Sequence, residues 1–165
     1  MMIFSLALFA NLNAESNPLL EDWKTPFGTP PFDRIKTEHY LPAFKEAIEL
    51  HKKEISDIIE NEDKPTFQNT IAALDYSGSK LKQVQRVFSA MNESMSSNEM
   101  TQLSKEISPM LSKHKDDINL NEDLFKKVKA VYENKDKMDL TTEENKVLEK
   151  YYKDFVRGGA NLSDK

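Results

Sequence analysis

Cysteine is absent from this sequence of 165 residues, and glycine occurs only four times. Without cysteine the chain forms no disulfide bond, carries no thiolate nucleophile and has no zinc site with sulfur ligands. Two of the four glycines are adjacent, at Gly158 and Gly159, and the sequence contains neither a glycine-rich phosphate loop nor a G-x-S-x-G nucleophile elbow. The signatures of nucleotide-dependent enzymes and of serine or cysteine hydrolases are therefore missing.

Basic residues are also fewer than acidic ones. The chain has 28 Asp and Glu against 23 Lys and Arg, which gives a net charge of -5 and a pI near 5.3. Nucleic-acid binding needs a basic face that displaces counterions from the phosphates. We therefore predict no nucleic-acid partner.

Long hydrophobic runs are lacking too. The most apolar stretch, MMIFSLALFANLNAES, is shorter than the roughly 20 residues that a membrane-spanning helix needs, so no stable membrane span is predicted. Residues 1–14 instead fit a secretory signal peptide, with Leu12 and Ala14 at positions −3 and −1 of a cleavage site. The start lacks Lys and Arg, and a buried N-terminal strand or helix is the alternative. A signal peptide predicts a periplasmic or secreted protein, and its absence a cytoplasmic one.

Residues 15–40 combine prolines with large apolar side chains. Proline fixes φ and pushes the preceding residue toward extended conformations, so no regular helix is expected there. The stretch is nevertheless too apolar for a solvated linker, because disordered segments are poor in aromatic residues. We expect an ordered, extended strap across the body of the domain, anchored by Trp23.

From Leu41 onward, apolar residues recur at the three-and-four spacing of amphipathic helices. Charged residues make up 31% and apolar residues 38% of the chain, a mixture that suits helices with solvated outer faces. No alternation typical of strands follows Glu38. Short connections favour antiparallel neighbours, so residues 41–165 are predicted to form an all-α, antiparallel bundle of about five helices. The expected helices cover residues 41–61, 66–95, 98–118, 121–132 and 142–157.

Three local patterns refine this expectation. Gly78 lies on the apolar stripe of the second helix, which predicts the close approach of a neighbouring helix. Pro109 is predicted to kink the third helix. The last helix carries two apolar stripes, and we expect one to pack on earlier helices and the other to stay exposed for helices that follow Ser163. The stripes are Val147, Tyr151 and Phe155, and Leu148, Tyr152 and Val156.

Histidines are the candidates for chemistry. The Glu38-His39 pair precedes a helix that begins near Pro42, whereas His51 and His114 lie on apolar stripes. No two histidines have the i, i+4 spacing that presents both rings to one metal ion. A histidine among core residues is usually hydrogen-bonded packing. We therefore predict no catalytic, cofactor-binding or metal-binding residue, and no cofactor held by this chain.

Several segments in succession carry a family resemblance. They are NPLLEDWKTPFGTPPFDRIKTEHYLPAFKEAI, PTFQNTIAALDYSG, SPMLSKHKDDINLNEDLFKKVKAVY and FVRGGANLSDK. In this order and spacing, from Asn17 to Lys165, they resemble the N-terminal region of the oligopeptidase A and peptidyl-dipeptidase Dcp group. These enzymes are zinc metallopeptidases related to thimet oligopeptidase.

The resemblance implies a helical wall of a deep channel that admits short, unfolded peptides. Zinc in that family is held by an H-E-x-x-H helix and a later Glu of a C-terminal domain, and no position here matches that motif. The expectation is an N-terminal portion of a peptidase that is inactive by itself, with oligopeptides and the catalytic domain as partners. The alternative is a stand-alone, non-catalytic helical module that binds peptides or proteins.

Overall fold

The computed structural model describes residues 16–95 and 97–160, so the predicted signal peptide at residues 1–14 lies outside the described residues. Within that part the chain is helical and contains no strand, which confirms the all-α prediction. No helix in this part is both long and apolar enough to cross a bilayer. The elements are α1 Tyr40–Glu60, a π-helical segment Phe67–Ala72, α2 Ala73–Tyr76, α3 Ser79–Ser94, α4 Asn98–Asn119, α5 Glu122–Glu133 and α6 Thr142–Gly158. Three short 3-10 turns cover Pro26–Gly28, Thr37–His39 and Lys135–Lys137.

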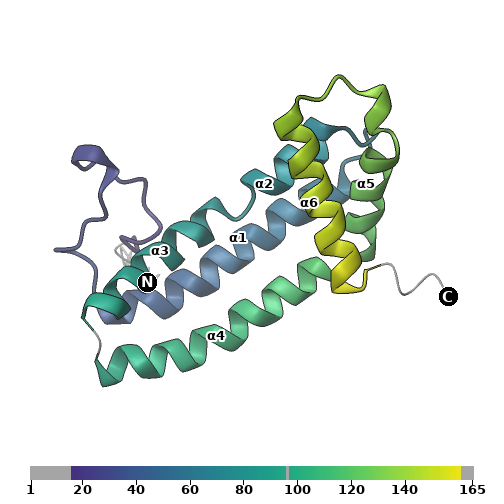
Figure 1. Cartoon of the computed structure of the whole chain (residues 1–165). Coiled ribbons are helices and arrows are strands. Elements are labelled where there is room, and N and C mark those ends of the chain that lie inside the picture. Colours follow the sequence, from purple (N-terminus) through teal and green to yellow (C-terminus); the bar gives the residue numbers. More distant parts are fainter. Residues whose placement is uncertain (1–15, 96, 161–165) are drawn as a thin grey trace, which may run out of the picture.

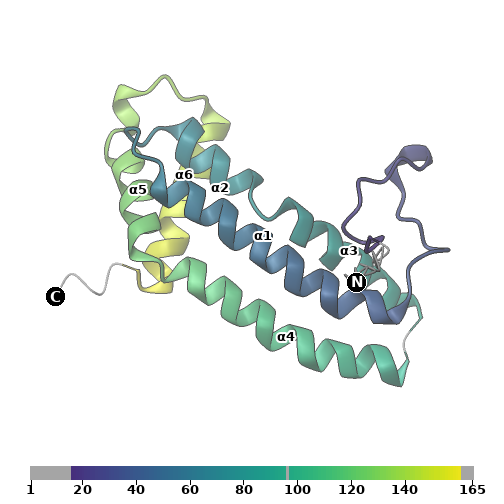
Figure 2. The same cartoon turned by 180° about the vertical axis from the view of Figure 1, so that it is seen from behind.

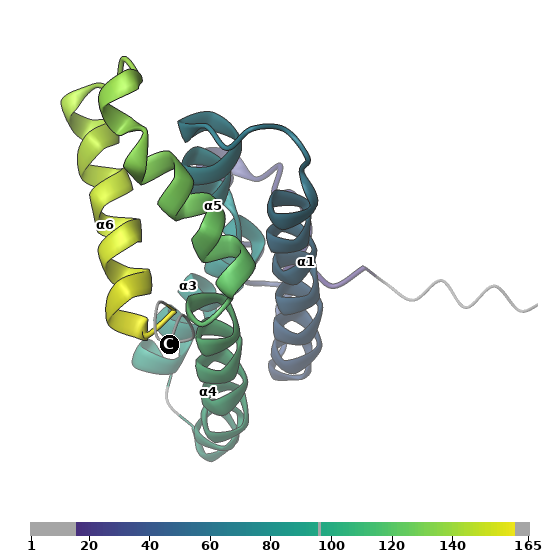
Figure 3. The ribbon, with the colours of Figure 1, turned by 90° about the vertical axis from the view of Figure 1, so that its right-hand side faces the viewer.

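The helices form two groups. Helices α1, α3 and α4 run along the long direction of the molecule, with α3 and α4 both packed on α1 (Figures 1 and 2). Helices α5 and α6 form an antiparallel pair that lies across the opposite end from the strap (Figure 3). The chain reverses between α1 and α3, between α3 and α4 and between α5 and α6, as the predicted antiparallel bundle requires, whereas α5 leaves the end of α4 at a steep angle (Figures 1 and 3).

Side-chain caps fix where several helical segments begin. The side-chain oxygens of Thr66, Ser97, Asn121 and Thr141 each accept a hydrogen bond from the backbone N–H three residues later. Such caps satisfy N–H groups that have no partner inside the helix. At Thr141 the Glu144 carboxylate also accepts from the Thr141 N–H, which completes a capping box.

The second predicted helix is not continuous. It is divided at Ser77 and Gly78, where Ser77 is extended and Gly78 adopts the left-handed conformation with φ +67°. The prediction of close approach is correct, because an added Cβ on Gly78 would lie 2.7 Å from ring atoms of His51 in α1. The prediction of an unbroken helix is wrong, since the same glycine turns the chain.

The strap is ordered, and its anchor is deeper than expected. Leu19 is fully buried against α1 and α3, while Trp23 is only partly buried and donates its indole N–H to the Pro18 carbonyl at 2.8 Å. Gln83 of α3 donates to the Leu19 carbonyl at 3.0 Å. Asn17 donates to the His39 carbonyl at 2.8 Å, which joins the strap to the beginning of α1.

Two hydrophobic clusters share α1. One gathers the strap, the first half of α1, α3 and the first part of α4, and the other gathers the second half of α1, the π-helical segment, α2, α5 and α6. In α1 the first cluster ends at Ile48 and the second begins at Ile55. His51 therefore lies at the boundary between the clusters.

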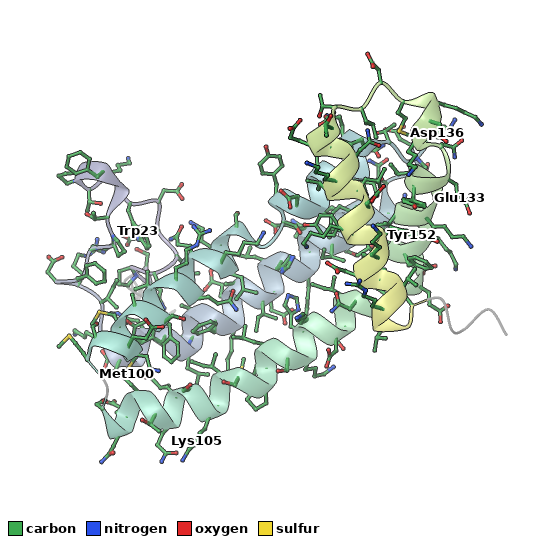
Figure 4. The ribbon with its side chains drawn as sticks, in the orientation of Figure 1. Trp23, Met100, Lys105, Glu133, Asp136 and Tyr152 are labelled. Atoms are coloured by element: carbon green, nitrogen blue, oxygen red, sulfur yellow. The ribbon has the colours of Figure 1, made fainter. Side chains whose placement is uncertain are left out.

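Both stripes of α6 are covered within the described chain, so the expectation of one exposed stripe is wrong. Leu148 is fully buried, and Val156 packs partly buried against the second cluster. Tyr152, labelled in Figure 4, belongs to the second stripe. Its ring stacks on that of Tyr132 of α5, with ring centroids 3.9 Å apart. The wide apolar arc of α6 is shared between α5 on one side and the π-helical segment on the other.

Candidate functional site

A pair of histidines occupies the boundary between the two clusters. His51 comes from the middle of α1 and His114 from α4, 63 residues later in the chain. Their rings meet edge to face with centroids 4.9 Å apart, and His114 is only 5% exposed. The position follows from helical periodicity, because both residues lie on the apolar faces with which α1 and α4 pack together.

A chain of hydrogen bonds runs through this pair. Ser77 donates its hydroxyl proton to the Leu74 carbonyl at 2.7 Å, and its oxygen lies 3.1 Å from His51 Nε2. His51 Nδ1 lies 3.0 Å from His114 Nε2. Glu54 accepts from the Gly78 N–H at 2.7 Å and holds the adjacent turn.

These bonds define where the protons lie. Because the Ser77 hydroxyl proton goes to the Leu74 carbonyl, the Ser77 oxygen accepts from His51 Nε2–H. His51 Nδ1 is then the acceptor, and His114 Nε2–H is its donor. His114 Nδ1 is left as a buried lone pair with no partner in the described part of the chain. Both rings are neutral in this arrangement.

Burial explains the neutral state. It lowers the pKa of His51 from 6.5 to about 4, with a further lowering from His114 and Lys82 and an opposing contribution from Glu54. Burial is also the largest cause that lowers the pKa of His114, followed by Lys52, against Asp117 and Glu49. A buried imidazolium loses its hydration, so the uncharged ring is favoured.

This arrangement does not form a nucleophilic triad. Ser77 is 6% exposed and its proton already goes to a carbonyl, whereas a serine nucleophile must donate to its base and face the substrate. It also does not suit zinc. Two imidazoles that hydrogen-bond to each other are not directed at a common ion, and the described residues include no group of three or more His, Cys, Asp or Glu side chains that could hold one.

The third histidine has a local structural role. His39 Nδ1 accepts from the Lys36 N–H at 3.1 Å and closes the 3-10 turn before α1. Glu38 is exposed and lies 3.8 Å from Lys36. The pair marks the start of a helix, as the sequence predicts.

An open groove adjoins the histidines between α3 and α4. One hollow of about 340 Å³ lies beside Gly78, His51 and His114, and a second of about 230 Å³ lies toward the loop that joins α3 to α4. Gln85 and Leu111 line both hollows, so they form one continuous groove, with Phe44 and His51 of α1 along its floor. No pattern in the sequence predicts this groove, because it depends on the spacing between two helices that pack on a third.

Comparison with known proteins identifies relatives of the chain. It is 36% identical over 149 residues to a dipeptidyl carboxypeptidase of Salmonella typhimurium and 37% identical over 147 residues to the dipeptidyl carboxypeptidase of Escherichia coli. Oligopeptidase A of Escherichia coli is 25% identical over 147 residues. The chain is homologous to these peptidases. The predicted family resemblance is thereby confirmed.

The similarity covers about nine tenths of this chain but only about a fifth of each relative. No protein-family model matches the chain. The homology therefore concerns one helical part of much longer peptidases.

Proposed function

We propose that this chain forms the helical N-terminal wall of the substrate channel in a zinc metallopeptidase that hydrolyses short peptides, of the peptidyl-dipeptidase or oligopeptidase type. The observation that carries the proposal is the similarity to dipeptidyl carboxypeptidases over 90% of the chain. Zinc would activate water and polarise the scissile carbonyl. The 165 residues contain no H-E-x-x-H, so the zinc ligands and general base belong to a different part of the enzyme.

The residues of this chain contribute shape and rigidity. The Ser77–His51–His114 hydrogen bonds link the α2–α3 joint to α1 and α4 at the boundary between the clusters. The strap fastens the beginning of α1 to α3 through Leu19 and Gln83. A wall held at these two places keeps its channel-facing surface fixed, which lowers the ordering cost when a substrate binds.

A segment exchange tests the proposal. In the Escherichia coli dipeptidyl carboxypeptidase, the matched 147-residue segment is replaced by the corresponding residues of this chain. We expect the chimera to release dipeptides from short peptides with zinc, and a variant that lacks the segment to be inactive. A control variant carries an unrelated helical bundle of similar length in the same place.

The measurements are the thermal transition of each protein and the rate of dipeptide release. A folded chimera no more active than the unrelated-bundle control would refute the proposal. That result would favour a stand-alone helical binding module.

We further propose that residues 1–14 direct export, with Leu12 and Ala14 before the cleavage site. The support is the apolar, uncharged composition of the segment. Expression of the full chain in a bacterium, followed by N-terminal sequencing of the periplasmic fraction, should give a mature protein that begins at Glu15. Material that keeps Met1 and stays in the cytoplasm would contradict this.

A further inference from the structure

The groove between α3 and α4 has uncharged polar rims. On α3 the rim consists of Gln85, Ser89 and Asn92, at spacings of four and three residues. On α4 it consists of Ser104, Ser108 and Ser112, each four residues apart. Such spacings place side chains along one face of a helix. The groove therefore presents two parallel rows of hydrogen-bonding groups.

Most of these rim groups have no partner within the described part of the chain. Ser108 donates to the Ser104 carbonyl at 2.7 Å, whereas the side chains of Gln85, Ser89 and Asn92 make no hydrogen bond there. Between the rims the floor is apolar, with Phe44 and Ile107 buried. An apolar floor between rows of unpaired polar groups is typical of a binding groove.

The two ends of the groove differ in charge. Lys82 and Lys115 are the charged side chains that line the hollow beside Gly78, and Glu93 is the one that lines the other hollow. Lys82 donates one hydrogen bond to the Asp75 carbonyl at 3.0 Å, which leaves its other N–H groups available. The neutral histidine pair adds no charge at the basic end.

We propose that this groove binds a short, extended peptide, with its carboxyl terminus toward Lys82 and Lys115 and its amino terminus toward Glu93. The proposal rests on the proposed function for the biological role of that peptide, which would be substrate on its way to the catalytic zinc. Beyond the proposed function, the groove specifies where the peptide binds, in which direction it runs and how many residues it spans.

Backbone chemistry favours an extended peptide over a helix. A helix satisfies most of its own N–H and C=O groups, whereas an extended strand offers unpaired groups that the polar rims can meet. The length is set by the rim. Lys115 follows Ser104 by 11 positions, a helical rise of about 16 Å, which corresponds to about five extended residues. The opposite charges at the ends match the two termini of a peptide of that length.

The test is a titration of the isotope-labelled 165-residue chain with penta-alanine, followed by two-dimensional NMR of its backbone amides. We expect saturable shifts at Gln85, Ser108 and their neighbours at millimolar peptide. Amidation of the peptide carboxyl terminus should weaken binding by about two- to fivefold, the effect of losing one exposed ion pair. Acetylation of the amino terminus should also weaken binding.

Matched variants separate the groove from the rest of α4. Ser108→Trp fills the centre of the groove and should abolish the shifts, whereas Lys105→Trp, on the side of α4 away from α3 (Figure 4), should leave them unchanged. The double change Lys82→Gln and Lys115→Gln should remove the preference for a free carboxyl terminus. Lys113→Gln, whose partner is Asp117 at 2.9 Å, should not.

Several results would overturn the proposal. They are no saturable shift at millimolar peptide, equal binding by the Ser108→Trp variant, equal affinity for free and amidated peptides, or shifts that depend on protein concentration alone, which would indicate a second copy. The outcome is independent of the segment exchange. An inactive chimera with intact peptide binding refutes the proposed function, and an active chimera without peptide binding refutes only the groove.

Discussion

Gly78 lies so close to the His51 ring that no side chain fits between them. An added Cβ would approach the ring to 2.7 Å, and the backbone at φ +67° is strained for any other residue. We therefore expect Gly78→Ala to lower the free energy of unfolding by about 2 kcal/mol or more. Urea denaturation at pH 7 measures the change.

The matched control is Gly28→Ala in the strap. Gly28 has a similar φ of +63°, but a Cβ there would meet nothing within 4 Å. Its cost should be only the conformational one, about 1 kcal/mol. If both variants lower the free energy of unfolding by the same amount, the close approach of Gly78 to His51 does not add to the cost, and the prediction is wrong.

The titration of His51 is the second prediction at this scale. The pKa of His51 is lowered to about 4 in the folded protein, so the unfolded state takes up the proton first as the pH falls. The contribution of the neutral His51 to the free energy of unfolding is therefore complete above pH 6.5 and is lost as the pH falls from 6.5 to 4. By linkage the loss is at most about 3 kcal/mol.

His51→Gln removes this titration. Urea denaturation at several pH values between 7 and 4 should show the variant losing less stability than the wild type over that range. His39→Gln, which changes a histidine outside the buried pair, should follow the wild type. A His51→Gln curve that runs parallel to the wild type would contradict the assignment.

At the scale of elements, α6 gives a prediction from its packing. Both of its stripes are covered, with Leu148 and Phe155 buried and Tyr152 stacked on Tyr132. Amides from Tyr151 to Val156 should therefore be strongly protected from hydrogen exchange in the chain alone, because opening them exposes packed apolar surface. Mass spectrometry of the exchanging protein provides the measurement.

The tip of the strap is the internal reference. Phe27 there is fully exposed, and the hydrogen bond from the Gly28 N–H to the Thr25 carbonyl lies on the surface. These amides should exchange rapidly. Rapid exchange in α6 as well would restore the view that one of its stripes awaits a further partner.

At the scale of the whole molecule, zinc supplies the prediction. The chain has no H-E-x-x-H, and its described residues present no cluster of three metal-binding side chains. We expect the purified 165-residue chain to hydrolyse no peptide with or without added zinc. The melting temperature should be the same in zinc and in EDTA, measured by calorimetry. Zinc-dependent turnover that survives repurification and chelation would contradict this expectation.

Much of this protein was determined by local sequence. Periodicity predicts the helices. The caps at Thr66, Ser97, Asn121 and Thr141, which fix where four helical segments begin, are likewise contacts between residues close in the chain. The structural role of Glu38-His39 follows in the same way. The prolines predict the strap, since their φ is fixed wherever they occur.

Only the tertiary structure decided how distant residues meet. The break at Gly78 depends on the His51 ring of another helix, and the His51–His114 pair joins residues 63 positions apart. The coverage of α6 depends on the direction in which α5 returns, and the groove depends on how far α3 and α4 lie apart on α1. These features arise from packing between helices, which the pattern of a single helix does not encode.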